Sequence, residues 1–366
     1  MIGSSDTELN ILLNCIDPSG NAGSITIPHT VYWTRLTDLA TRHRMIPLLH
    51  QALSGTGNPN ITNEFTSEIK RKHLTNTARN EFLVEQQEKI LTSLESEGIK
   101  ALPFKGSALA RAAFNDTSMR QFDDIDLLLA KQDILKAAQT LLSEGYTPHL
   151  SMKDRTRKRH IESGWGFSLV SPNADYHVEL LSSPVPDLCI MNLPEPLIMS
   201  DAPDAVLLLL CIHAWKHRWE RLSWTADIVY FIHYHPDLDW DNLITNAKET
   251  GTKRILLTTL KLASGFPGVD IPEQVTALFS SDSIIEPLVE EVITNWSVET
   301  KTPDSRSSIV HFAFKTRERL SDRLKYLLAI LLIPSCGEWE LVDLPAPLYF
   351  LYFFIRPFRL LLGRKK

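Results

Sequence analysis

Three aspartates lie close together in the stretch "QFDDIDLLLA", directly before an apolar run with the composition of a buried strand. Asp124 and Asp126 are two residues apart, so on a strand their side chains point to the same face, whereas Asp123 points to the other. Carboxylates at this density repel each other unless solvent, a cation or a basic partner offsets their charge. Magnesium prefers such oxygen ligands and often uses only one or two of them. The spacing therefore predicts a divalent-cation site at Asp124 and Asp126.

A third carboxylate from a neighbouring strand would complete a two-metal site, which can stabilise both the attacking and the leaving oxygen of phosphoryl transfer. Glu179 is the natural candidate, because apolar strand residues flank it in "YHVELL". We therefore expect Asp124, Asp126 and Glu179 to be the metal ligands and the catalytic carboxylates. The alternative for the aspartate pair is a solvated turn at a strand end.

Gly106 and Ser107 lie upstream, at a predicted turn from a strand into a helix. Glycine lets the backbone approach a phosphate closely, and the N–H groups at a helix start favour anions. Ser107 can add a hydroxyl group. Lys105 and Arg120 bracket the turn and the acids, so either could contact phosphate oxygens. The alternative is that each simply balances the charge of the neighbouring aspartates.

The elements that must position these residues alternate between about residues 97 and 185. Strand-like runs ("IKALPF", "IDLLLA", "FSLV" and "YHVELL") alternate with the helix-like runs "SALARAAF" and "KQDILKAAQTLLSEG". This alternation is typical of a small α/β unit. The residues before and after it have mostly helical periodicity. We predict an N-terminal helical region (1–96), a core (97–185) and a C-terminal helical domain (186–366).

The order of these features resembles the nucleotidyltransferase superfamily that includes DNA polymerase beta. Its signature is an apolar residue, Gly, Gly or Ser, a spacer, acid-apolar-acid-apolar and a later third acid. Here the signature reads Phe104-Lys105-Gly106-Ser107, Asp124-Ile125-Asp126-Leu127 and Glu179. More narrowly, the chain resembles the bacterial family called uncharacterised nucleotidyltransferases. That resemblance rests on "LPFKGSALA", "MRQFDDIDLLL", "HAWKHRWERLSWTADI" and "LYFFIRPFRLLL", and spans roughly Trp33 to Leu362.

The resemblance implies an α+β protein in which a small polymerase-beta-like core is flanked by helical regions. It also implies transfer of a nucleoside monophosphate from a nucleoside triphosphate to an acceptor hydroxyl, with Mg²⁺, or alternatively Mn²⁺, as the cofactor. Asp124 and Asp126 would bind the metal and the triphosphate, and Glu179 would help to activate the attacking hydroxyl. The lysine before Gly106 and the glutamate at the third position depart from the usual pattern.

A second stretch of interest is "DAVLLLLCIHAWKHRWERLSWTADI". On a helix, His213 and His217 lie one turn apart, with Lys216 beside them. Histidines at this spacing can bind zinc, but neither a third ligand nor the glutamate of an HExxH motif accompanies them. We expect Lys216 and His217 to contact the nucleotide, and Asp227 to pair with one of these bases. Three tryptophans of this stretch are most simply core aromatics: Trp215, Trp219 and Trp224.

The composition is that of an ordinary soluble protein: of 366 residues, 43% are hydrophobic and 22% charged. The net charge of -6 gives no global attraction to nucleic acid or anionic lipid, so any anion-binding surface must be local. Four scattered cysteines without a CxxC pair favour a reducing compartment. The apolar runs are shorter than the roughly 20 residues of a membrane-spanning helix, and the N-terminus lacks a secretory signal pattern. We expect a cytoplasmic protein.

Two stretches leave alternatives open. The basic run "KDRTRKRH" (153–160) is either a solvated face or a mobile strip that meets triphosphate or a polyanionic acceptor. It lacks the interleaved aromatics of a nucleic-acid platform. The C-terminal "PLYFLYFFIRPFRLLLGRKK" is either a buried terminal helix that Pro357 kinks or breaks, or a contact for a membrane surface or a partner.

The acceptor is not indicated by any motif: a small molecule, a sugar, a peptide product, RNA and a protein all remain open. Two other functions compete with the enzyme. One is a non-catalytic module that binds a nucleotide or a partner on the same fold. The other is a membrane-associated scaffold that acts through the C-terminus.

Overall fold

The computed structural model describes residues 6–20, 25, 27–54, 60–150, 166–185, 191, 193–298, 306–334, 336–342 and 344–361. One mixed sheet and many helices make up this part of the chain, so the predicted α+β class with flanking helices is confirmed. The basic run 153–160 lies outside the described residues.

The sheet has five short strands in the order β1-β2-β5-β4-β3. Their bounds are β1 Ala101–Pro103, β2 Asp124–Leu129, β3 Thr147–Pro148, β4 Phe167–Val170 and β5 His177–Leu181. The central strands β2 and β5 are parallel, while the other neighbours pair antiparallel. The parallel register places Asp126 beside Glu179 and Asp124 beside His177.

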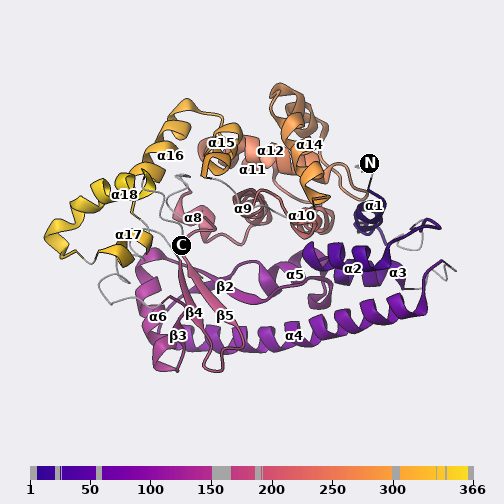
Figure 1. Cartoon of the computed structure of the whole chain (residues 1–366), viewed down its shortest axis with the longest axis horizontal. Helices are drawn as coiled ribbons and strands as arrows, with labels where there is room; N and C mark the ends of the chain where they lie inside the picture. The colour runs from indigo at the N-terminus through magenta and orange to yellow at the C-terminus, as the bar shows by residue number, and fades with distance from the viewer. Residues whose placement is uncertain are drawn as a thin grey trace.

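Helices precede, interrupt and follow the sheet (Figure 1). The first group is α1 (Thr7–Asn14), α2 (Trp33–Arg42), α3 (Ile46–Leu53) and the long α4 (Asn63–Ser96). Between the strands lie α5 (Gly106–Phe114), η2 (Thr117–Met119), η3 (Lys131–Asp133) and α6 (Ile134–Ser143). After the sheet come α8 (Glu195–Ile198), α9 (Pro203–Lys216), α10 (Leu222–Tyr234), α11 (Trp240–Glu249), α12 (Lys253–Ala263), α13 (Glu273–Thr276), η5 (Ala277–Ser281), α14 (Ile285–Trp296), α15 (Arg306–Thr316), α16 (Leu320–Leu332), α17 (Cys336–Leu341), η6 (Ala346–Leu351) and α18 (Tyr352–Leu361).

The two faces of β2 belong to different hydrophobic clusters. Ile125, Leu127 and Leu129 pack with residues of α4 and α6, on the face along which α4 runs in Figure 1. Leu128 belongs instead to a larger cluster that joins the N-terminal helices, α5 and the helices from α9 to α14. Because side chains alternate along a strand, Asp124 and Asp126 share this second face with Leu128.

The larger cluster takes residues from all three predicted regions. Trp215, Trp219 and Trp224 are buried, as expected for core aromatics. The boundaries at residues 96 and 185 remain predictions.

The C-terminal segment differs from the sequence expectation. Helix α18 continues through Pro357, and its side chains are not uniformly buried, since Phe354 is 62% and Phe358 66% exposed. Arg356 and Arg359 both form ion pairs with the buried Glu338, and these pairs anchor the helix despite the hydrogen bond that proline removes. Among the described residues, no helix combines the length and the apolar character needed to cross a membrane.

Candidate functional site

The turn between β1 and α5 has an unusual backbone. Lys105 has φ 64° and ψ -139°, and Gly106 has φ 42°. Glycine adopts positive φ at little cost, whereas for lysine this conformation is strained and must be held by its surroundings. The turn places the start of α5 beside the first residues of β2, because a Cβ added to Gly106 would lie 3.7 Å from the carbonyl oxygen of Asp124.

Asp124, Asp126 and Glu179 line one pocket with a volume of about 190 Å³, together with Gly106. We call it the acid pocket. It lies where β2 and β5 run side by side and where the residues at the C-terminal end of α9 cover them. The structure therefore brings the three carboxylates and the glycine turn into one pocket, while their roles as metal ligands and catalytic groups stay predictions.

Asp126 is the most buried acid of this pocket, at 3% exposure. Its Oδ2 lies 3.0 Å from the Nζ of Lys105, while its Oδ1 has no hydrogen-bond partner among the described residues. The pKa of Asp126 is raised to about 7, mainly by burial and further by the neighbouring Asp124 and Glu179, while Lys105 acts in the opposite direction. A buried carboxylate with one unsatisfied oxygen favours the arrival of a cation or a hydrogen-bond donor.

Basic side chains converge on the same pocket. Of its described lining residues, five are lysine or arginine and four are aspartate or glutamate. The five cations are Arg44, Lys105, Arg120, Lys216 and Arg221. Such a mixture suits a polyanion bound through a metal, because the acids hold the cation and the bases meet the remaining phosphate oxygens.

Arg120 is fixed on the pocket wall. Its Nε donates to Asp227 Oδ1 at 2.9 Å, and its Nη1 donates to the carbonyl oxygen of Gly106 at 3.5 Å. The backbone oxygen of Arg120 accepts from Asn76 and Asn80 of α4 at 3.1 and 2.7 Å. Asp227, which we expected to pair with a base of the α9 stretch, pairs instead with Arg120. The sequence missed this because the two residues lie 107 positions apart.

Ser107 does not present its hydroxyl to the acid pocket. The side chain is 1% exposed, and its Oγ donates to Gln87 Oε1 of α4 at 3.1 Å. Ser107 is also not among the described lining residues of the pocket. The only group that Ser107 could offer a phosphate is its backbone N–H, at the N-terminal end of α5.

Lys216 and His217 both line the acid pocket, and so does His213, which sequence reasoning did not select. His213 is 7% exposed, and its Nδ1 has no partner among the described residues. Burial holds the pKa of His213 well below its usual range, and the nearby Lys105, His217 and Lys216 lower it further. A neutral imidazole thus faces the pocket. Its only sequence signal was its place one turn before His217.

Arg44 and Arg221 are the other lining residues that the sequence did not indicate. Arg44 has a positive φ of 57° and forms an ion pair with Asp123, whose side chain is 56% exposed. Burial and the charge of Arg44 lower the pKa of Arg221. Neither arginine lies near the acid motif in sequence, so no local pattern could have found it.

The donor set fits a divalent cation only in part. Within the described ranges, no three His, Cys, Asp or Glu side chains are arranged to hold a metal ion. His213 and His217 are therefore not part of such a group either. Asp126 is turned toward Lys105, which already supplies a positive charge. Asp124 and Asp126 can nevertheless hold Mg²⁺ together with substrate phosphates, because this ion commonly takes only one or two protein carboxylates.

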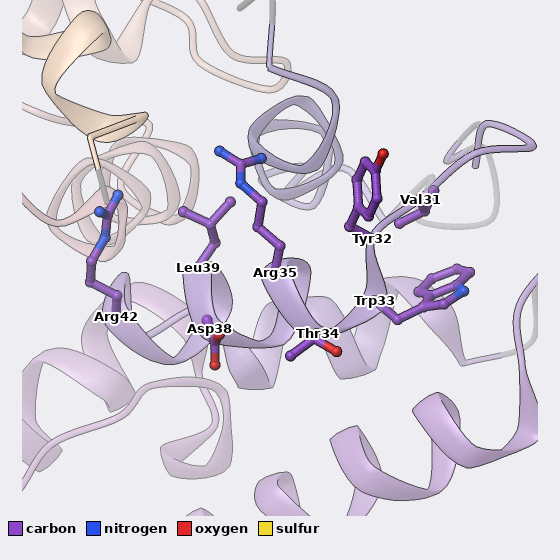
Figure 2. A pocket seen from close by; sticks show the side chains of 8 residues that line it. All are labelled: Val31, Tyr32, Trp33, Thr34, Arg35, Asp38, Leu39 and Arg42. Carbon is purple, nitrogen blue, oxygen red and sulfur yellow. The ribbon is translucent and has the colours of Figure 1, made fainter. Parts of the chain in front are cut away.

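A second cavity, of about 690 Å³, runs along α2 (Figure 2). Arg35 and Arg42 extend to the same side of the helix in this view. Arg35 already pairs with Asp6 and Glu8, and Arg42 donates to backbone oxygens near the end of α14. None of the candidate residues from the sequence lies among the lining residues of this α2 cavity.

The comparison with protein families gives a match. The family model described as uncharacterised nucleotidyltransferase covers residues 29–267. The chain belongs to this family. The part matched to the uncharacterised nucleotidyltransferases includes the glycine turn, the three acids and all of α9 and α10, whereas the C-terminal "LYFFIRPFRLLL" lies outside it. Searches of curated proteins and of solved structures found no match.

Proposed function

We propose that the protein transfers a nucleoside monophosphate from a nucleoside triphosphate to an acceptor hydroxyl, with Mg²⁺ or Mn²⁺ as cofactor and pyrophosphate as the second product. Membership of a nucleotidyltransferase family supports nucleotidyl transfer. The observation that carries the site assignment is the buried Asp126, which has one unpartnered oxygen in a pocket lined by five cations.

The three carboxylates and the glycine turn of the acid pocket each have a role in this proposal. Asp124 and Asp126 hold the divalent ion, which supplies charge neutralisation at the phosphates when it is bound. The Gly106 turn and the start of α5 orient the phosphates. Glu179, beside Asp126 on the neighbouring strand, accepts the proton of the attacking hydroxyl.

Lys105 has two successive roles. Without ligand, its ammonium balances the buried charge of Asp126. Metal ligation by Asp126 supplies that positive charge instead, so Lys105 can turn to a phosphate oxygen. Arg120 and Lys216 add further positive charge where negative charge develops.

Calorimetric titration of the four nucleoside triphosphates, with and without Mg²⁺, tests the site. We expect magnesium-dependent binding in the wild type and none in the Asp124→Asn, Asp126→Asn double variant. Asp123→Asn is the matched control, since Asp123 is adjacent in sequence but does not line the pocket. Failure of the folded wild type to bind any nucleotide, or unchanged binding in the double variant, contradicts the proposal.

A non-catalytic nucleotide-binding module is the second candidate, and the Lys105–Asp126 ion pair favours it because a lysine supplies charge where a metal would otherwise sit. The two candidates differ in turnover. Pyrophosphate release from the bound nucleotide, with glycerol as a model acceptor hydroxyl, is expected for the enzyme and must disappear in Asp126→Asn. Nucleotide binding without any Asp126-dependent pyrophosphate release favours the binding module.

A further inference from the structure

A second, apolar pocket of about 260 Å³ adjoins the acid pocket. Leucines of β1, β2, α5 and α9 form much of its wall, together with Ala108 and Ala112 of α5. Apart from Lys105, its polar side chains among the described residues are Ser200 and Asp201. We call it the apolar pocket.

The two pockets follow one another along the same pair of elements. On β2, Asp126 lines the acid pocket, and Leu128, two residues later on the same face, lines the apolar pocket. On α9, Val206, Leu209 and Leu210 line the apolar pocket, whereas His213 and the next turn line the acid pocket. These positions recur every three or four residues and therefore form one helix face. A single molecule that lies along this face of α9 would contact both pockets.

Lys105 lies at the junction, because it lines both pockets. Its Nζ is 3.0 Å from Asp126 Oδ2 and 5.5 Å from the ring centroid of Phe104, which faces the apolar side. The rings of Phe104 and His213 meet edge to face at 6.4 Å across the same boundary. The apolar space thus begins beside the carboxylate that we assign to metal binding.

We propose that the apolar pocket holds the aliphatic part of the acceptor, whose hydroxyl reaches the acid pocket. This inference rests on the proposed function. A nucleoside triphosphate has no aliphatic chain, and every base presents several hydrogen-bonding edges, for which a wall made mostly of leucine and alanine offers few partners beyond Lys105, Ser200 and Asp201. The apolar part therefore belongs to the other substrate. The acceptor class is an alcohol that carries an aliphatic chain or side chain.

Transfer at the junction forms one bond to the α-phosphorus and breaks another. The acceptor oxygen forms a bond to the α-phosphorus, while the bond from that phosphorus to the bridging oxygen of the β-phosphate breaks. Pyrophosphate leaves with the electron pair of that bond, and the hydroxyl proton passes to Glu179. Glu179 lies beside Asp126 on the neighbouring strand, about 4.8 Å away in the direction of the hydrogen bonds.

Straight-chain 1-alkanols from butanol to octanol probe this pocket directly, because they combine a hydroxyl with an aliphatic chain. They are titrated into the full chain with alanine methyl groups labelled for NMR, and the signals of Ala108 and Ala112 are followed. We expect saturable shifts at both methyl groups. The affinity is expected to rise about fourfold for each added methylene, as for apolar burial, until the pocket is full.

Two variants fill the pocket from different helices: Ala112→Phe from α5 and Val206→Phe from α9. Each is expected to weaken octanol binding at least tenfold while magnesium-dependent nucleotide binding remains. Two variants are used so that a fold defect in one does not decide the outcome. Arg111→Phe adds the same ring at an exposed position of α5 and serves as the control.

Three results overturn the inference: no saturable shift, an affinity independent of chain length, or equal binding in the wild type and both filled variants. A nucleoside triphosphate that itself shifts Ala112 and displaces octanol assigns the pocket to the base and also overturns it. If octanol binds but no nucleotide does, the acceptor role falls with the proposed function. If nucleotide binds but octanol does not, the inference alone fails.

Discussion

The acid pocket and the α2 cavity both collect arginines, but they differ in what their polar side chains already contact. The α2 cavity is larger, about 690 against 190 Å³. Its Arg35 is neutralised by Asp6 and Glu8. In the smaller pocket, Asp126 keeps one buried oxygen without a partner among the described residues, which costs about 1–3 kcal/mol. We therefore assign the ligand site by the unsatisfied buried carboxylate and the cations around it, and not by cavity volume.

The largest contrast is expected when one residue of each region is changed. Asp126→Asn removes a metal ligand and is expected to weaken magnesium-dependent nucleotide binding roughly 100-fold, the equivalent of about 2.7 kcal/mol. Arg35→Gln in the α2 cavity is expected to leave the affinity within about twofold, since no step of binding uses Arg35. Equilibrium dialysis with the best nucleotide measures both. The reverse pattern would move the site to the α2 cavity.

Removing the positive charge beside Asp126 sharpens the comparison in the absence of ligand. Lys105→Met leaves a buried carboxylate without its cation and is expected to lower the free energy of unfolding by about 3 kcal/mol at pH 8. The loss is smaller at pH 5, where Asp126 is protonated. Urea unfolding measures this loss. Lys89→Met, which breaks an exposed ion pair on a helix, is the control and is expected to lower the free energy of unfolding by about 0.5 kcal/mol or less. Equal small losses in both variants would show that Asp126 does not depend on Lys105.

The pH dependence of the metal-free protein tests the burial of Asp126. Its pKa is raised to about 7 in the folded chain, whereas an unfolded aspartate titrates near 3.9. Between these values the folded state binds a proton that the unfolded state has released, so this contribution to stability falls as the pH rises from about 4 to 7. Asp126→Asn is expected to flatten the profile of unfolding free energy over this range. A profile identical in both proteins contradicts the assignment.

The smallest effect is expected at Ser107. Because its hydroxyl points to Gln87, Ser107→Ala is expected to lower the free energy of unfolding by about 1 kcal/mol and to leave nucleotide affinity within about twofold. Calorimetry and urea unfolding on the same preparation separate the two effects. A tenfold loss of affinity at unchanged stability would mean that the hydroxyl contacts the nucleotide.

Much of the core could be predicted because its signals are local. Strand alternation in β2 and the glycine after β1 depend only on neighbouring residues, and parallel pairing of β2 with β5 then brings Glu179 beside Asp126. The two-residue strand β3 gave no periodic signal. Arg44, Arg221 and the partner of Asp227 were missed because they depend on how distant helices pack over the sheet. The direction of the Ser107 hydroxyl likewise follows from the place of α4.

The most direct test of the central claim is a crystal structure of the protein with Mg²⁺ and a nucleoside triphosphate analogue whose α,β-bridge cannot be cleaved. We predict a metal ion about 2.0–2.1 Å from carboxylate oxygens of Asp124 and Asp126, with Lys105 moved from Asp126 to a phosphate oxygen. A nucleotide bound in the α2 cavity, or one bound in the acid pocket with no metal on these two aspartates, would contradict the account.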